Sequence, residues 1–194
     1  LRDMQEKQHR QAPTLRFVAY APFFDGDTTK LSQQFDNDPT MRRELEPLTS
    51  SGEEAVGTAR LMRGQAITGT AATEAHFREV APKARMIHLA THGEANDKSG
   101  GRSLLYFSAI KDSVENELLY ARDLYNMTLN ADMVVLSACE SGLGKLQRGE
   151  GVISLARAFA YAGAKSVFTS LWSVSDESTK DLMLLFYKKK KKGM

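Results

Sequence analysis

The chain has one cysteine among its 194 residues. No disulfide can form within it, so the simplest compartment is a reducing one such as the cytoplasm. The chain also lacks a large excess of charge of one sign, because its 26 basic and 24 acidic side chains leave a formal net charge of +2. This balance gives no overall attraction for nucleic acid, and we expect no nucleic-acid partner. The lone thiol, Cys139, is left as a candidate nucleophile.

Long hydrophobic runs are missing as well. No apolar run approaches the roughly 18 residues of a membrane-spanning helix, and we expect no membrane partner. The opening stretch, LRDMQEKQHRQ, is polar and lacks the apolar centre of a signal peptide. With 42% hydrophobic residues the chain can bury one substantial core. We therefore expect one domain over 15–194, preceded by a polar N-terminal segment at 1–14.

What the sequence does contain is an alternation of short apolar runs with helical patterns. Strands are expected where aliphatic and aromatic residues follow one another, at 15–21, 85–91, 132–138 and 166–172. Helices are expected where apolar residues recur every three or four positions, at 53–62, 73–80, 152–161 and 176–187. The alternation predicts an α/β fold with a mostly parallel sheet covered by helices on both faces.

Two expected strands lead directly into a reactive side chain. The strand at 85–91 is followed by His92, and the strand at 132–138 by Cys139. Carboxyl ends of parallel strands share one edge of a sheet, and the two chains lie about 5 Å apart there if the strands are neighbours. A thiol needs an adjacent base, since only a few per cent of it is ionised near neutral pH. The pattern predicts Cys139 as nucleophile and His92 as general base, with no metal or organic cofactor required.

Backbone amides near the two side chains are candidates for stabilising negative charge. Acyl transfer passes through a tetrahedral intermediate whose oxyanion needs hydrogen-bond donors. Gly93 follows the expected base directly, and a glycine lets a backbone approach closely. By position, we expect the amides of Gly93 and Cys139 to face the oxyanion.

Other conspicuous residues have ordinary explanations. His88 stands four residues before His92, but four strand residues span about 13 Å, so the two cannot share a metal ion and we expect His88 to be structural. The stretch GLGKLQRGEG at 142–151 lacks the Lys-Ser or Lys-Thr of a phosphate loop and indicates a loop bordering the site. Five lysines at 188–192 are expected to be a solvated helix end whose charges suit the helix dipole.

Three stretches, in this order, resemble the CHAT domains, with weaker similarity back to about Leu15. They are IHLATHGEAND at 87–97, LNADMVVLSACESGLGKLQRGEG at 129–151 and SLARAFAYAGAKSVFTSLWSVSDESTKDLMLLFYKKKKKG at 154–193. The peptidase clan of these domains includes caspases, gingipains and separase. The resemblance implies a three-layer α/β/α sandwich of the caspase-hemoglobinase kind, with a catalytic His-Cys dyad.

The resemblance also implies features outside the dyad. CHAT domains often share a polypeptide with tetratricopeptide repeats, so such repeats are expected on the full-length chain. The family domain usually begins earlier and continues past Gly193, so this chain is expected to be trimmed at both ends.

The gap from base to nucleophile, 139 − 92 = 47 residues, is close to the roughly 50 residues of caspases. The local caspase signature is not matched, since Ser137–Ser141 keeps only the small residue and the cysteine.

Asp176 closes the stretch SLWSVSD, which follows an expected buried strand. The segment resembles the separase segment in which an aspartate holds the arginine before the cleaved bond. The resemblance thus implies substrate binding by Asp176 and cleavage after Arg or Lys. The alternative is that Asp176 caps the helix that follows it.

The leading hypothesis is a cysteine endopeptidase that acts on protein or peptide substrates. One alternative is a catalytically inactive CHAT-type module for protein interaction or scaffolding, in which Cys139 is an inert buried thiol. A hydrolase of small amides on the same fold is the other.

Overall fold

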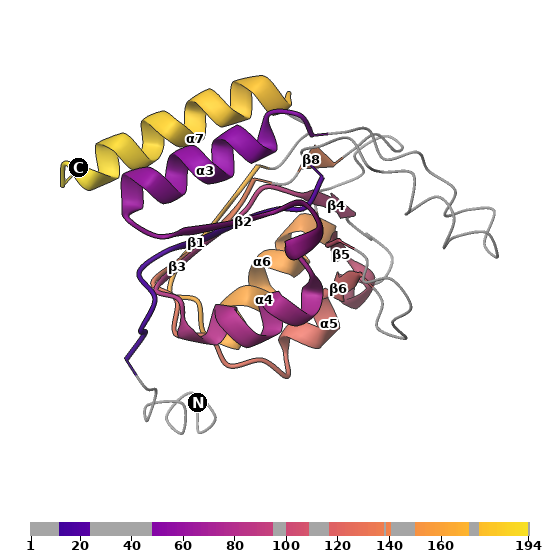
Figure 1. Cartoon of the computed structure of the whole chain (residues 1–194). Coiled ribbons are helices and arrows are strands. Elements are labelled where there is room, and N and C mark those ends of the chain that lie inside the picture. The colour runs from indigo at the N-terminus through magenta and orange to yellow at the C-terminus, as the bar shows by residue number, and fades with distance from the viewer. Residues whose placement is uncertain are drawn as a thin grey trace.

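The computed structural model describes residues 12–23, 48–94, 100–108, 117–137, 139–140, 150–170 and 175–193. These residues form two sheets (Figure 1). The larger is a five-stranded parallel sheet with the strand order β2-β1-β3-β7-β9. Its strands are β1 (Val18–Ala21), β2 (Gln65–Thr68), β3 (Met86–Leu89), β7 (Met133–Leu136) and β9 (Val167–Thr169). The smaller is a four-stranded mixed sheet of β6 (Leu118–Tyr120), β5 (Leu104–Tyr106), β4 (His92–Glu94) and β8 (Cys139–Glu140).

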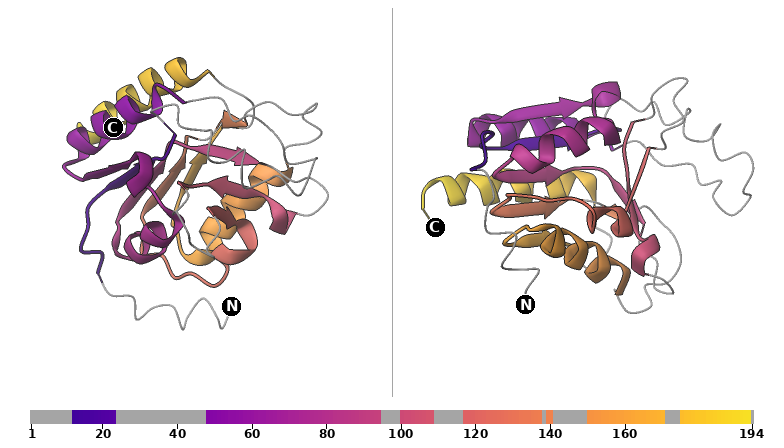
Figure 2. Two further views of the ribbon diagram at one scale, coloured as in Figure 1. Left: turned by 45° about the vertical axis from the view of Figure 1, so that its right-hand side comes forward. Right: turned by 90° about the horizontal axis from the view of Figure 1, so that it is seen from below.

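Helices cover both faces of the larger sheet (Figures 1 and 2). On one face lie α3 (Ser51–Met62) and α7 (Asp176–Lys191), side by side. On the other lie α4 (Glu74–Val80), α5 (Ala121–Leu124) and α6 (Glu150–Ala162). Short 3₁₀ turns connect elements at Gly69–Ala71, Ala81–Lys83 and Gly100–Arg102. This arrangement confirms the expected three-layer α/β/α sandwich.

Strand residues alternate between the two helical layers, which is why the buried strands read as continuous apolar runs. In β3, Ile87 and Leu89 join the core on the side of α4 and α6. Met86 joins the separate core beneath α3 and α7. That second core also contains the small residues Ala19 of β1 and Ala55 of α3, which allow the helix to lie close to the sheet.

The helix α3 ends at a left-handed residue that is not a glycine. Arg63, with φ of 56°, adopts the left-handed conformation, and its N–H bonds back into the last turn. Gly64 is needed for another reason: a Cβ there would lie 2.3 Å from the carbonyl oxygen of Phe17. The absence of a side chain lets the chain turn into β2 directly against β1.

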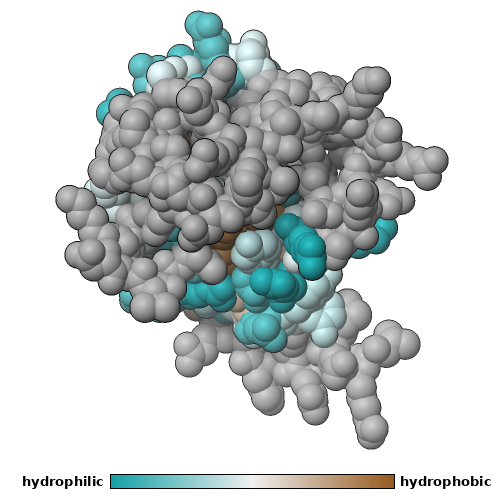
Figure 3. Space-filling model, turned by 90° about the vertical axis from the view of Figure 1, so that its right-hand side faces the viewer, coloured by the Kyte–Doolittle hydropathy of each residue, from teal (hydrophilic) through white to brown (hydrophobic). Residues whose placement is uncertain are grey.

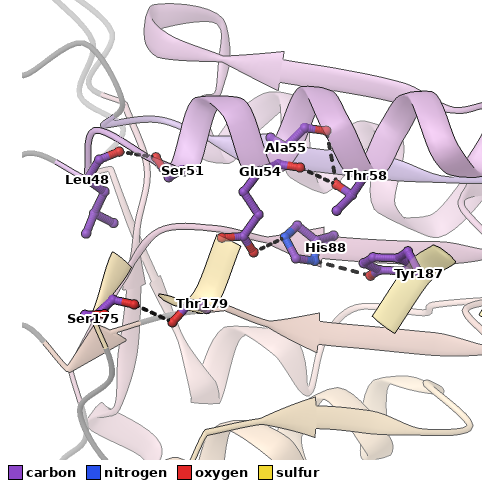
Figure 4. A network of polar contacts seen from close by, with 9 residues as sticks. All are labelled: Leu48, Ser51, Glu54, Ala55, Thr58, His88, Ser175, Thr179 and Tyr187. Atoms are coloured by element: carbon purple, nitrogen blue, oxygen red, sulfur yellow. Dashed lines mark hydrogen bonds and ion pairs between the residues drawn. The ribbon is translucent and has the colours of Figure 1, made fainter. Parts of the chain in front are cut away.

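A buried polar network joins the sheet to α3 and α7 (Figure 4). The Nε2 atom of His88 lies 2.8 Å from Oε1 of Glu54, and its Nδ1 atom lies 3.2 Å from the hydroxyl of Tyr187. These three side chains are at most 1% exposed. Burial, and secondarily the charge of Glu54, raises the pKa of Tyr187, so its hydroxyl stays protonated and can donate to Nδ1. The network agrees with a structural role for His88.

We predict that His88→Ala lowers the free energy of unfolding by about 3 kcal/mol or more, because the buried Glu54 carboxylate loses its partner. Urea unfolding followed by circular dichroism measures this. Tyr187→Phe is the matched control and should cost about 1 kcal/mol, since it removes one hydrogen bond from a neutral donor. Adding Glu54→Gln to His88→Ala should recover part of the loss. Equal losses in His88→Ala and Tyr187→Phe would show that the histidine–carboxylate contact contributes little.

Candidate active site

The strands leading to His92 and Cys139 are neighbours, and they keep one register throughout. Leu89 pairs with Leu136 in the larger sheet, 136 − 89 = 47 positions further on. The N–H of Ser137 then donates to the carbonyl oxygen of Leu89 at 2.9 Å, which carries the ladder past the end of that sheet. In the smaller sheet His92 of β4 pairs directly with Cys139 of β8, again 139 − 92 = 47 positions further on. The parallel pairing of β3 with β7 therefore determines which residue Cys139 faces.

The backbone around the pair is held from both sides. Gly93 lies in β4 between β5 and β8, and pairs with Glu140 on the β8 side. The hydroxyl of Thr91 donates to the carbonyl oxygen of Tyr106 at 2.6 Å, which ties the link between β3 and β4 to β5. Gly93 and Cys139, the two residues expected to supply oxyanion amides, thus belong to paired strands.

The imidazole of His92 is fully buried. The ring of Phe23, itself 3% exposed, lies against it with a centroid distance of 5.3 Å and an interplanar angle of 47°. Surrounding side chains, Phe23 among them, therefore separate the imidazole from solvent. Sequence reasoning did not single out Phe23, because one aromatic residue after a strand carries no pattern of its own.

Asp176 is the first residue of α7, which begins at the end of the larger sheet where β4 and β8 lie (Figures 1 and 2). Its Oδ2 atom accepts the N–H of Ser50 at 2.6 Å, at the start of α3. The cap of α7 is Ser175, whose hydroxyl accepts the N–H of Ser178. The alternative that Asp176 caps its own helix is therefore wrong: its carboxylate serves the first turn of α3 instead.

The environment of Asp176 disfavours its charge. Partial burial is the main cause of a raised pKa, and the nearby carboxylate of Glu54 adds to it, whereas the hydrogen bond from Ser50 acts in the opposite direction. A carboxylate has further lone pairs beyond the one that Ser50 uses. The group can therefore accept an additional donor, and a cation would favour its ionised form.

Seen from the carboxyl end of the strands, the described residues show a small hydrophobic area bordered by hydrophilic side chains (Figure 3). Among these residues, no three His, Cys, Asp or Glu side chains are grouped to hold a metal ion. None of the helices described is both long enough and apolar enough to cross a membrane. Most of the glycine-rich stretch at 142–151 lies outside the described residues.

Comparison with known proteins agrees with this architecture. Tetratricopeptide repeat protein 28 of Mus musculus and that of Homo sapiens are each 27% identical over 172 residues, covering 73% of this chain and 7% of the relative. The chain thus corresponds to a small part of these relatives. The family model for the CHAT domain, which is of the caspase-like peptidase superfamily, matches residues 1–194. With its parallel α/β/α sandwich and its match over the whole sequence, the chain belongs to the CHAT domain family.

Proposed function

We propose that this CHAT domain is a cysteine endopeptidase in which Cys139 is the nucleophile and His92 its general base. The direct pairing of His92 with Cys139 across β4 and β8 carries the proposal. Backbones of adjacent strands are about 5 Å apart, a separation from which a thiol and an imidazole can reach one another. The caspase-like superfamily to which the domain belongs supports the same chemistry.

In the proposed reaction, His92 takes the proton of Cys139 and the thiolate attacks the carbonyl carbon of the scissile bond. The amides of Gly93 and Cys139 donate to the oxyanion of the tetrahedral intermediate. The C–N bond then breaks, His92 gives its proton to the leaving amine, and a thioester remains on Cys139. Water that has lost a proton to His92 hydrolyses the thioester, which releases the carboxylic acid and restores the thiol. These steps require no metal or organic cofactor.

The burial of His92 supports regulated rather than constant activity. Its imidazole becomes accessible only when neighbouring side chains such as Phe23 move. An activating partner or another part of the full-length protein would have to favour that change. The relatives are named for tetratricopeptide repeats, which supports such repeats on the full-length chain. The same burial favours a second candidate, a non-catalytic interaction module.

We extend the proposal to cleavage after Arg or Lys, with Asp176 binding the basic side chain. Ionisation of its half-buried carboxyl group is unfavourable in the free protein, as its raised pKa indicates. A substrate guanidinium or ammonium group would offset that cost by pairing with the charge. The hydrogen bond from Ser50 holds the carboxylate in one orientation, at the junction of α3 and α7.

We predict that Cys139→Ala and His92→Ala each lower the cleavage rate by at least about a thousandfold, because each removes a member of one catalytic unit. Cleavage of a protein substrate by the full-length protein measures this, and a peptidyl acyloxymethyl ketone should form a mass-detectable adduct on Cys139. His88→Ala is the control and should retain activity per folded molecule.

Three results would decide against the dyad. Cleavage at the normal rate by Cys139→Ala would exclude the thiol mechanism. A folded but inactive His88→Ala alongside an active His92→Ala would reassign the base. Absence of both cleavage and adduct in the full-length protein would favour the interaction module.

We predict that Asp176→Asn lowers kcat/KM for substrates with Arg or Lys before the cleaved bond by about two to three orders of magnitude, because the basic side chain is left unpaired. Peptide libraries profiled with wild type and variant measure the preference. The neighbouring exposed carboxylate offers a matched control, Glu177→Gln, which should leave the preference unchanged. A wild-type profile favouring acidic or apolar residues, or normal cleavage of basic peptides by Asp176→Asn, would contradict the assignment.

The fold should tolerate this substitution. The amide oxygen of Asn can still accept the N–H of Ser50, so we expect a change in unfolding free energy within about 0.5 kcal/mol. The sign follows from the pKa: a carboxyl whose pKa is raised by folding costs stability once pH exceeds that pKa, and Asn carries no such cost. At pH 7 the variant should be as stable as wild type or slightly more so in thermal unfolding.

A further inference from the structure

A cavity of about 510 Å³ lies at the amino ends of the strands of the larger sheet, opposite the end that holds β4 and β8. The last turns of α3 and α7 border it, at the end of the molecule where the C-terminus lies (Figure 1). Its lining includes Met86, the first residue of β3, whereas His92 lies beyond the other end of that strand. The cavity is therefore separate from the candidate active site.

The lining of this cavity combines mostly buried apolar side chains, which form its floor, with exposed cations, which form its rim. The floor consists of Leu61, Met62, Met86 and Met133. The rim consists of Arg16, Arg63, Arg85, Lys190 and Lys191. Methionine side chains adapt their shape to irregular apolar groups. The volume falls within the range of roughly 300–1,000 Å³ that is usual for small-molecule sites.

The acidic side chain of the lining is already matched by cations. Asp132 accepts hydrogen bonds from Lys165, at 2.7 Å, and from Arg85. These two bonds are the main causes of its lowered pKa, so it remains ionised and engaged. Within the described residues, the other four cations of the rim form no ion pair. The rim thus presents an excess of positive charge over an apolar surface.

Helix dipoles account for only part of this gathering of charge. The carbonyl ends of α3 and α7 favour nearby cations, which suits Arg63, Lys190 and Lys191. Arg16 precedes β1 and belongs to neither helix, yet it lines the same cavity. An anion between these side chains would relieve their mutual repulsion.

We propose that this cavity binds a small organic anion, with a phosphate or carboxylate group at the cationic rim and an apolar body on the methionine floor. Guanidinium groups form paired hydrogen bonds with both kinds of anion, and the lysine ammonium groups add charge. The floor gives a molecule with an apolar body an advantage over a bare inorganic ion.

Isothermal titration at low ionic strength with hexyl phosphate, heptanoate, inorganic phosphate and hexanol tests the proposal. At least one of the two amphiphilic anions should bind saturably, about tenfold or more tightly than inorganic phosphate and hexanol. Added salt should weaken this binding. Whichever amphiphile binds more tightly identifies the anionic group. Failure of both to saturate, or equal binding of hexanol, would overturn the proposal.

Substitutions of residues that line the cavity, compared with a control outside it, test whether the amphiphilic anion binds there. Combined Arg16→Gln and Arg63→Gln should weaken binding of the amphiphilic anion by about tenfold, since two exposed cations are removed. Arg60→Gln is the matched control, because Arg60 is an exposed arginine in the last turn of α3 that does not line the cavity, and this variant should leave affinity unchanged. Leu61→Asn should weaken the amphiphile but not inorganic phosphate. With circular dichroism confirming the fold, equal affinity in the double variant and in Arg60→Gln would contradict the assignment.

Discussion

The parallel pairing of β3 with β7 is the constraint on which the candidate site depends. Both strands continue past the larger sheet into β4 and β8 without a change of register. A slip of one residue would turn every side chain of a strand to the opposite face, and the two cores would resist it. The division of the strand residues between the two cores therefore determines that His92 and Cys139 are directly paired.

The layer of α3 and α7 joins two distant parts of the chain to that sheet. Beneath it, His88 links β3 to both helices through Glu54 and Tyr187. At its start, Asp176 bonds to the backbone of Ser50. Buried polar contacts of this kind demand specific partners, because an unpaired charge in an apolar core is costly. The layer thereby places Asp176 at the end of the sheet that carries the candidate dyad.

Much of the central sheet could be predicted from the sequence, because β1, β3, β7 and β9 lie within short apolar runs. Such runs are typical of parallel strands that are covered on both faces. The smaller sheet was not predicted, since strands of two or three residues are too short to show a period. Local patterns also could not reveal the bond between Asp176 and Ser50, which are 126 residues apart. The contact of Phe23 with His92 depends on tertiary packing in the same way.

The ionisation of Cys139 tests the central claim most directly, and its status as the single cysteine makes the measurement unambiguous. The rate of alkylation by iodoacetamide, followed against pH, reports the thiolate fraction of this one residue. If His92 is its base, wild type should show a thiolate at a pH well below the ordinary thiol pKa of about 8.5, and His92→Ala should return the profile to that ordinary value. Superimposable profiles at the ordinary pKa in both proteins would contradict the dyad.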